Sequence, residues 1–96
     1  MRPYRVAIAP QVAGVIRALH PDLKRSVKNA LRALSAEPST GEPLRRDLEG
    51  LWKYRVRRFR IVYAIDRASR VVQVLAVGHR RTVYEELTEE RRRPRE

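Results

Sequence analysis

Hydrophobic positions along the chain follow two different periods. In residues 4–9, large apolar residues alternate with small or polar ones, which predicts a first β-strand. Residues 10–20 carry apolar side chains at i, i+3, i+4 and i+7, which predicts an amphipathic helix that ends at Pro21, because a residue before proline avoids the α conformation. Residues 22–34 repeat this spacing and predict a second helix, capped by Asp22 and antiparallel to the first.

The second half of the chain has the pattern of strands. Residues 37–43 contain helix and strand breakers and predict a loop, which continues to residue 50 as a connection. Residues 51–57 and 60–66 predict the two strands of a hairpin with a tight reversal between them. Residues 71–77 are nearly all apolar, which is typical of a strand buried on both faces and therefore central in its sheet.

These elements define the expected fold class. The order β-α-α-β-β-β predicts an α+β fold in which an antiparallel helix pair packs on a mainly antiparallel four-stranded sheet. Residues 83–91 predict a short C-terminal helix. We expect a single domain over residues 1–90, followed by a basic, disordered tail over residues 91–96.

The predicted hairpin carries five positive charges over residues 51–63 and no negative one. A charged strand face is often just solvated, but like charges side by side destabilise a sheet, so five of them favour a functional explanation. Because side chains switch faces at every residue, we expect one core face and one cationic face on the first hairpin strand. The core face would hold Trp52, Tyr54 and Val56, and the cationic face Lys53, Arg55 and Arg57. Tyr63 is likewise expected in the core rather than on a base-stacking platform.

Composition narrows the possible partners. The 96 residues contain 22 Lys and Arg against 11 Asp and Glu, a net charge of +11, which indicates a polyanion such as nucleic acid or a strongly acidic protein. The absence of cysteine excludes disulfides and thiolate chemistry. Two histidines without ligand spacing favour no metal site, and we expect no small-molecule cofactor. No stretch resembles a signal peptide or a membrane span, so we expect a cytoplasmic protein without membrane contact.

A cluster of basic residues at the end of the apolar strand suggests phosphodiester chemistry. His79, Arg80 and Arg81 follow that strand and are expected beside the cationic hairpin face. Guanidinium groups fork onto phosphate oxygens and stabilise the extra charge of a pentavalent transition state. In RNA the 2′-hydroxyl can attack the neighbouring phosphorus, so the protein needs a base, charge stabilisation and help for the leaving oxygen.

Two residues are candidates for the base. Lys53 is one, since arginines around it would disfavour its charged form, and His79 is the other. Tyr84 is expected to stack on a base or donate a proton, or else to pack the terminal helix on the sheet. His20 is expected to be a corner residue without a catalytic role.

Further basic residues are expected to contact the phosphates of a nucleic acid, although a charged outer face is common on any soluble helix. They are Lys24, Arg25, Lys28 and Arg32 on the second helix, Arg45 and Arg46 before the hairpin, and Arg57, Arg58 and Arg81.

Four segments in order resemble the RelE/ParE superfamily, the toxin components of bacterial type II toxin–antitoxin pairs. The resemblance extends from about residue 4 to residue 86. The segments are Leu44-Arg45, Gly50 to Val56, Arg60 to Tyr63, and Gly78 to Arg81 followed by Val83-Tyr84.

The resemblance implies a microbial-ribonuclease-like fold that is neutralised by a wrapping antitoxin segment. RelE-like members cut mRNA in the ribosomal A site without a metal and leave a 2′,3′-cyclic phosphate, which inhibits translation, whereas ParE-like members poison DNA gyrase. We favour the RelE-like activity, with the ParE-like one as the alternative. The partners implied are a cognate antitoxin, the ribosome and mRNA, so the further basic residues named above would contact RNA or the ribosome.

The resemblance also implies roles for single residues. Lys53 and Arg55 match two basic positions on the first hairpin strand, Arg60 and Arg80 match phosphate-stabilising arginines, and Tyr84 matches a C-terminal tyrosine. One departure is that Arg55 stands where a second lysine can occur. Arginine stays protonated and is a poor base.

Overall fold

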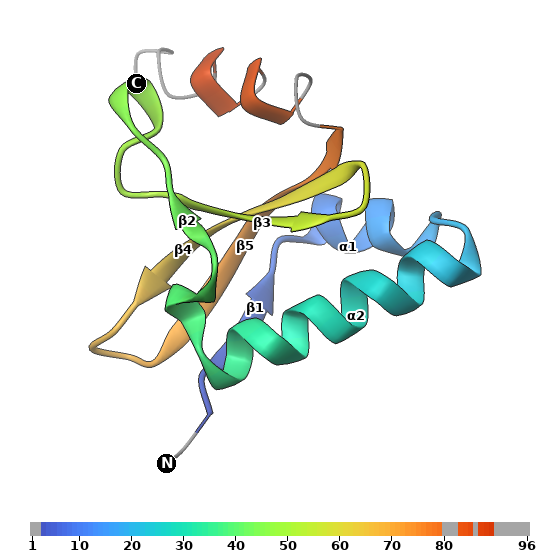
Figure 1. Ribbon diagram of the computed structural model, residues 1–96, viewed down its shortest axis with the longest axis horizontal. Helices are drawn as coiled ribbons and strands as arrows, with labels where there is room; N and C mark the ends of the chain where they lie inside the picture. Colours follow the sequence, from blue (N-terminus) through green and yellow to red (C-terminus); the bar gives the residue numbers. More distant parts are fainter. Residues whose placement is uncertain (1–2, 80–82, 86, 90–96) are drawn as a thin grey trace.

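The structure, a computed structural model, describes residues 3–79, 83–85 and 87–89 (Figure 1). It confirms an α+β fold with helices packed on a sheet. The elements are β1 (Arg5–Ile8), α1 (Pro10–Arg17), α2 (Pro21–Ala36), the 3-10 helix η1 (Pro38–Thr40), β2 (Glu42–Pro43), the 3-10 helix η2 (Arg46–Leu48), β3 (Trp52–Val56), β4 (Phe59–Asp66) and β5 (Val71–His79). Residues 83–85 and 87–89 are also helical, as expected for a C-terminal helix.

The described residues form one sheet in the order β1-β5-β4-β3-β2. Strand β1 pairs with β5 in parallel, and the other neighbours are antiparallel. The apolar strand β5 lies between two strands, which confirms its predicted interior place. The sheet has five strands rather than the predicted four, because β2 forms inside the segment expected to be a loop.

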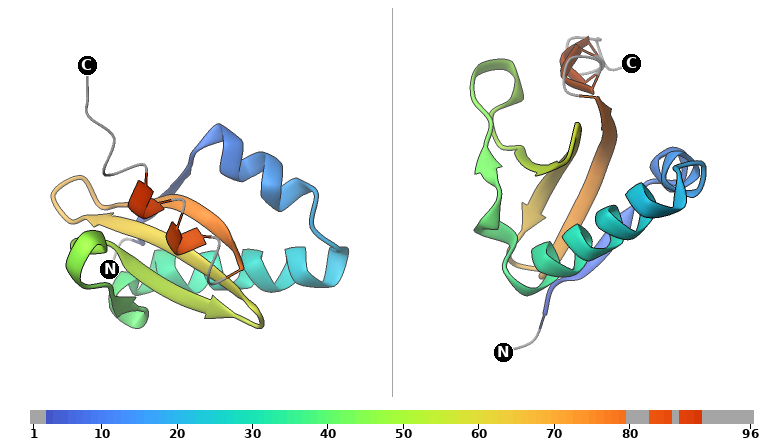
Figure 2. Two further views of the ribbon diagram at one scale, coloured as in Figure 1. Left: turned by 90° about the horizontal axis from the view of Figure 1, so that it is seen from above. Right: turned by 45° about the vertical axis from the view of Figure 1, so that its right-hand side comes forward.

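Helices α1 and α2 run in opposite directions and cover one face of the sheet (Figure 2). The main core lies between them and this face, and its fully buried side chains include Val27, Leu34, Ile61 and Tyr63. The residues at helical spacing in the sequence therefore supply the contact with the sheet. Trp52 and Tyr54 pack against this core and Val56 is buried in it, so the predicted core face of β3 is confirmed.

The junction between the helices differs from the prediction in its cap. His20, not Asp22, is the N-cap of α2, and its Nδ1 accepts a hydrogen bond from the Asp22 backbone N–H at 3.2 Å. Pro21 takes the first helical position, where its fixed φ suits the helix and a backbone N–H would have no partner. Asp22 then lies in the first turn. His20 is an exposed corner residue, as expected.

The opposite face of the sheet carries a second, smaller core. Leu48 and Leu51 from the segment before β3 pack with Val62 of β4 and with Val83 and Leu87 of the C-terminal helical residues. Figure 2 shows these two segments on the side of the sheet away from α1 and α2. Lys53 and Arg55 therefore share their face of the sheet with apolar residues, because the connection over residues 44–50 folds back onto the sheet.

The end of β5 is fitted closely to the C-terminal helix. A side chain at Gly78 would collide with the Cγ2 methyl of Val83, so a glycine is needed where the chain turns onto the second core. The tail over residues 91–96 lies outside the described residues, and its disorder stays a prediction. In the described part of the chain, every helix is too short or too polar to cross a membrane.

Candidate functional site

The structure brings Lys53, Arg55 and Arg60 together in one cavity of about 450 Å³. Two adjacent strands supply these three side chains, and the loop between η1 and β2 closes the other side. The volume is within the range of small-ligand sites. The cavity is lined by Thr40, Gly41, Glu42, Lys53, Tyr54, Arg55 and Arg60.

Arg55 and Arg60 form a like-charged pair across the hairpin. They are directly opposite each other in the β3–β4 register. Arg55 Nε donates to the Arg57 carbonyl at 3.1 Å, and Arg60 Nη1 donates to the Phe59 carbonyl at 3.2 Å. Among the residues that the structure describes, no carboxylate pairs with either guanidinium. Because like charges directly opposite each other destabilise a sheet, this arrangement suits a bound anion.

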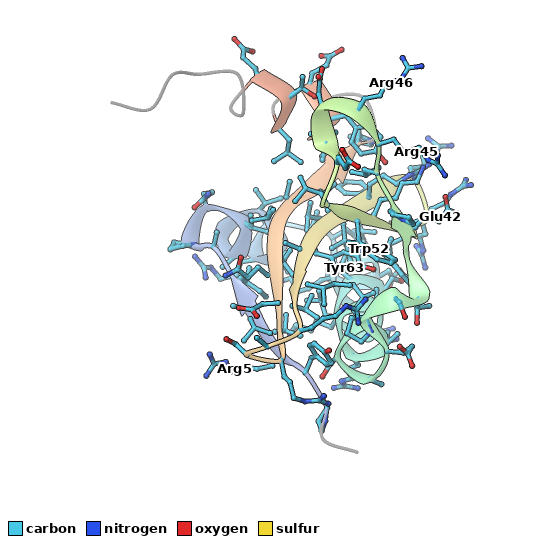
Figure 3. All side chains as sticks on the ribbon, turned by 90° about the vertical axis from the view of Figure 1, so that its left-hand side faces the viewer. Arg5, Glu42, Arg45, Arg46, Trp52 and Tyr63 are labelled. Atoms are coloured by element: carbon cyan, nitrogen blue, oxygen red, sulfur yellow. The ribbon has the colours of Figure 1, made fainter. Side chains whose placement is uncertain are left out.

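Glu42 supplies a negative charge that sequence reasoning missed. Its Oε2 lies 3.8 Å from Lys53 Nζ, and the two residues are directly opposite each other in the β2–β3 register. The Lys53 side chain is 29% exposed and that of Glu42 is 78% exposed. Figure 3 shows Glu42 at the same edge of the molecule as Arg45 and Arg46. Residues 51–63 of the hairpin lack an acidic residue, as noted from the sequence, but the neighbouring strand β2 provides one.

Tyr63 holds the loop that carries Glu42. Its hydroxyl donates to the Pro38 carbonyl at 2.6 Å, and its side chain is fully buried, with the Trp52 ring stacked at 6.4 Å between centroids. Burial raises the pKa of Tyr63 from 10.0 to about 12, an effect that the Gly41 backbone opposes and Tyr54 reinforces. A Cβ at Gly41 would collide with the Tyr63 hydroxyl and the Lys53 carbonyl. The loop, which lines the cavity, is thus held against the sheet.

His79 lies on the other face of the sheet. It is opposite Phe59 at the end of β5, and the two rings are 4.5 Å apart between centroids. Phe59 packs against the helix-side core, whereas the residue opposite Arg60 is Gly78. The expected grouping of His79 with Lys53 was therefore wrong, since alternation along β5 turns the imidazole to the helix side.

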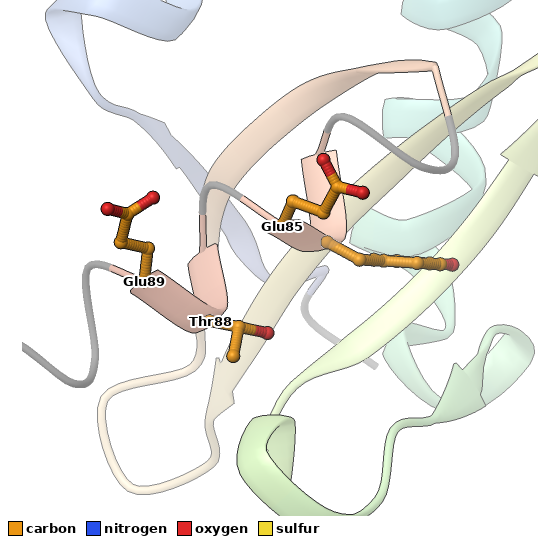
Figure 4. Close-up of a pocket in the computed structure, with 4 residues that line it drawn as sticks. Glu85, Thr88 and Glu89 are labelled. Carbon is orange, nitrogen blue, oxygen red and sulfur yellow. The ribbon is translucent and has the colours of Figure 1, made fainter.

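Tyr84 packs against the second core, on the sheet face that carries Lys53. Its hydroxyl is buried and has no hydrogen-bond partner among the residues that the structure describes. Its ring lines a hollow of about 470 Å³ together with Glu85, Thr88 and Glu89 (Figure 4). The two carboxylates make this hollow a poor site for a phosphate. Arg80 and Arg81 lie outside the described residues.

The remaining basic candidates are spread over the surface. On α2, Arg25, Lys28 and Arg32 are exposed and Lys24 is half-buried, while Arg25 lies 3.9 Å from the Asp22 carboxylate. The exposed arginines at positions 45, 46, 57 and 58 surround the entry and the tip of the hairpin. Over the described residues, no group of three or more potential ligands is arranged to hold a metal ion.

The fold is that of toxins of type II toxin–antitoxin systems, as the comparisons with known proteins show. Residues 16–84 match the family model of the ParE toxin of the type II toxin–antitoxin system parDE, and the chain belongs to this family.

Relatives and solved structures agree with this assignment. Toxin RelG of Mycobacterium tuberculosis is 34% identical over 84 residues, which cover 85% of this chain and 97% of that protein. The toxin–antitoxin complex RelBE2 of the same organism contains a chain with 34% identity and a TM-score of 0.75, matched over 83% of this chain and 94% of that chain. A free mutant of Escherichia coli toxin RelE has a TM-score of 0.76 at 22% identity, over 92% of this chain and 97% of that one, and supports the fold alone.

Proposed function

We propose that this toxin is an endoribonuclease that cuts mRNA on the ribosome and thereby inhibits translation. The observation that carries the proposal is the cavity in which Arg55 and Arg60, opposite each other and without a carboxylate partner among the described residues, lie beside Lys53. Two guanidinium groups beside Lys53, around a cavity of about 450 Å³, suit one phosphodiester with part of its nucleotide.

The reaction would use the RNA's own 2′-hydroxyl as nucleophile. Its oxygen attacks the adjacent phosphorus and gives up its proton to a base, while the bond from phosphorus to the 5′-oxygen breaks and that oxygen takes a proton. The products are a 2′,3′-cyclic phosphate and a 5′-hydroxyl end. Arg55 and Arg60 would stabilise the extra negative charge of the pentavalent transition state.

Lys53 is the proposed base, because it lines the cavity while His79 lies on the opposite face of the sheet. Tyr84 lies on the Lys53 face, and its hydroxyl has no partner in the described part of the chain. This hydroxyl is the proposed donor to the leaving 5′-oxygen; if the ring turns outward, the ring is instead a stacking platform for a base. Arg80 keeps its proposed phosphate-stabilising role on the resemblance alone.

A cognate antitoxin is the proposed inhibitor. The M. tuberculosis relative with 34% identity was solved as a toxin–antitoxin complex. A net charge of +11 favours an antitoxin with an acidic or amphipathic segment that covers the cationic surface. Mixing the two proteins should suppress mRNA cleavage near an equimolar ratio, and tight binding without loss of cleavage would contradict a blocking mechanism.

The decisive experiment is primer extension on an mRNA translated in a reconstituted system. Wild-type protein should cut at ribosome-positioned codons, and Arg60→Ala should cut about 100 to 1,000 times more slowly, as expected when one transition-state donor is lost. Arg67→Ala is the matched control, since Arg67 is exposed in the turn between β4 and β5, outside the cavity, and should keep the wild-type rate. Equal rates for wild type and Arg60→Ala would show that this cavity is not the active site.

The family match favours one alternative, inhibition of DNA gyrase, which the resemblance assigns to ParE-like members. An mRNA left intact by the wild-type protein, together with loss of gyrase supercoiling activity, would favour this alternative. The same arginine substitution would then test whether the cavity is the gyrase-contacting surface.

A further inference from the structure

We infer that the Glu42 carboxylate pairs with the Lys53 side chain in the free toxin and there competes with the phosphate of an incoming nucleic acid. The inference rests on the proposed function, since it assigns a control element to the same cavity. Glu42 would be a positioning residue that acts through Lys53.

The geometry of β2 aims Glu42 at Lys53. The two residues are a direct cross-strand pair, and their charged atoms are 3.8 Å apart. Both line the cavity that also holds Arg55 and Arg60. A carboxylate presents two oxygens to a cation as a phosphate does, so Glu42 occupies the position of a ligand on Lys53.

The backbone fixes the place of Glu42. Strand β2 has two residues, and the preceding loop is fixed to the sheet by the hydrogen bond from the Tyr63 hydroxyl to the Pro38 carbonyl. Gly41 approaches the sheet so closely that a Cβ would collide with the Lys53 carbonyl. The loop therefore has little freedom to carry Glu42 away, and only the side chain itself, which is 78% exposed, can swing aside.

This arrangement opposes anion binding in a way that can be reversed. A phosphate that reaches Lys53 must displace the Glu42 carboxylate or accept its repulsion. Because the Glu42 side chain is mostly exposed, the ion pair is of modest strength, and removal of the Glu42 charge should tighten phosphate binding about fivefold at low salt. Salt screens exposed charges, so this gain should shrink as ionic strength rises.

Fluorescence anisotropy with a labelled, fully 2′-O-methylated oligoribonucleotide tests the inference, because this probe cannot be cleaved through its 2′ position. A DNA oligonucleotide of the same sequence serves as a second probe, since the effect depends on phosphate. Glu42→Gln should bind both about five times more tightly than the wild type in 50 mM salt. Glu37→Gln is the matched control: it removes the same charge from the same loop, while Gln can still accept the hydrogen bond from the Ser39 hydroxyl.

A double-mutant cycle separates the effect of the Glu42–Lys53 ion pair from general repulsion between Glu42 and the phosphates. In a Lys53→Met background, which removes the cation and keeps an unbranched side chain as long as the aliphatic part of lysine, Glu42→Gln should give less than half of its gain. An equal gain in that background, an equal gain from Glu37→Gln, or weaker binding by Glu42→Gln would each overturn the inference. Cleavage of mRNA by the wild type is measured separately, so a failure of the proposed nuclease leaves these binding ratios interpretable.

Discussion

The hydroxyl of Tyr63 gives a sharp test of how the loop beside the cavity is held. Substitution to Phe keeps the buried ring and removes only the donor to the Pro38 carbonyl. A buried acceptor left without its partner costs about 1 to 2 kcal/mol, so Tyr63→Phe should lower the free energy of unfolding by this amount at pH 8.

Alkaline pH should remove most of this difference. The folded protein keeps the Tyr63 proton up to a pKa of about 12, whereas the unfolded chain loses it near 10.0. Above pH 10 the unfolded state therefore binds fewer protons than the folded state, and stability falls as pH rises. At pH 11 this linkage removes about 1.4 kcal/mol from the wild type and nothing from Tyr63→Phe. The two proteins should then be nearly equally stable.

Urea denaturation at pH 8 and pH 11 measures this change. Trp52, which stacks on Tyr63 and is the only tryptophan in the chain, reports unfolding by its fluorescence. Subtracting the tyrosinate absorbance titration of Tyr63→Phe from that of the wild type isolates the Tyr63 hydroxyl. A stability difference between the two proteins that is the same at both pH values would refute the linkage.

Three further substitutions test single features of the fold. Gly78→Ala should lose about 1 to 3 kcal/mol of stability in urea denaturation, because its methyl would overlap the Val83 side chain; an unchanged midpoint would mean that the C-terminal helix shifts without cost. Arg57→Asn should gain up to about 1 kcal/mol, since Arg57 has φ 56° and Asn tolerates this conformation better, while RNA binding in the anisotropy assay weakens; unchanged binding would remove Arg57 from the contact surface. His20→Ala should lose about 1 kcal/mol as α2 loses its cap, and full mRNA cleavage activity should remain; impaired cleavage by a folded variant would contradict its purely structural role.

The helices and the long strands were predictable because their signal is local. Apolar spacing in α1 and α2 follows one period, and the apolar run of β5 is typical of an interior strand. Strand β2 gave no such signal. It contains a proline and has two residues, and its pairing with β3 depends on distant contacts such as that of Tyr63 with Pro38. Because β2 could not be predicted, its Glu42–Lys53 pair could not be predicted either.

The placement of His79 shows a second limit. Alternation tells which residues of one strand share a face, but the faces of two strands can be compared only through their register. A one-residue slip moves every side chain to the other face, and the pairing of β4 with β5 contains a shift at Val62/Tyr63. Lys53, Arg55 and Arg60 were grouped correctly because a tight hairpin fixes their register locally.

The position of the cavity follows from how the second core ends. Val62, opposite Lys53, is covered by Leu48, Leu51 and the C-terminal helical residues, whereas Arg60 lies two residues closer to the hairpin turn. The apolar cover stabilises the sheet up to Lys53, and the two arginines extend beyond it as a like-charged pair. Any phosphate that binds between them would relieve this repulsion and stabilise the fold by mass action. The same residues that make the isolated hairpin less stable are therefore those that favour an anionic partner.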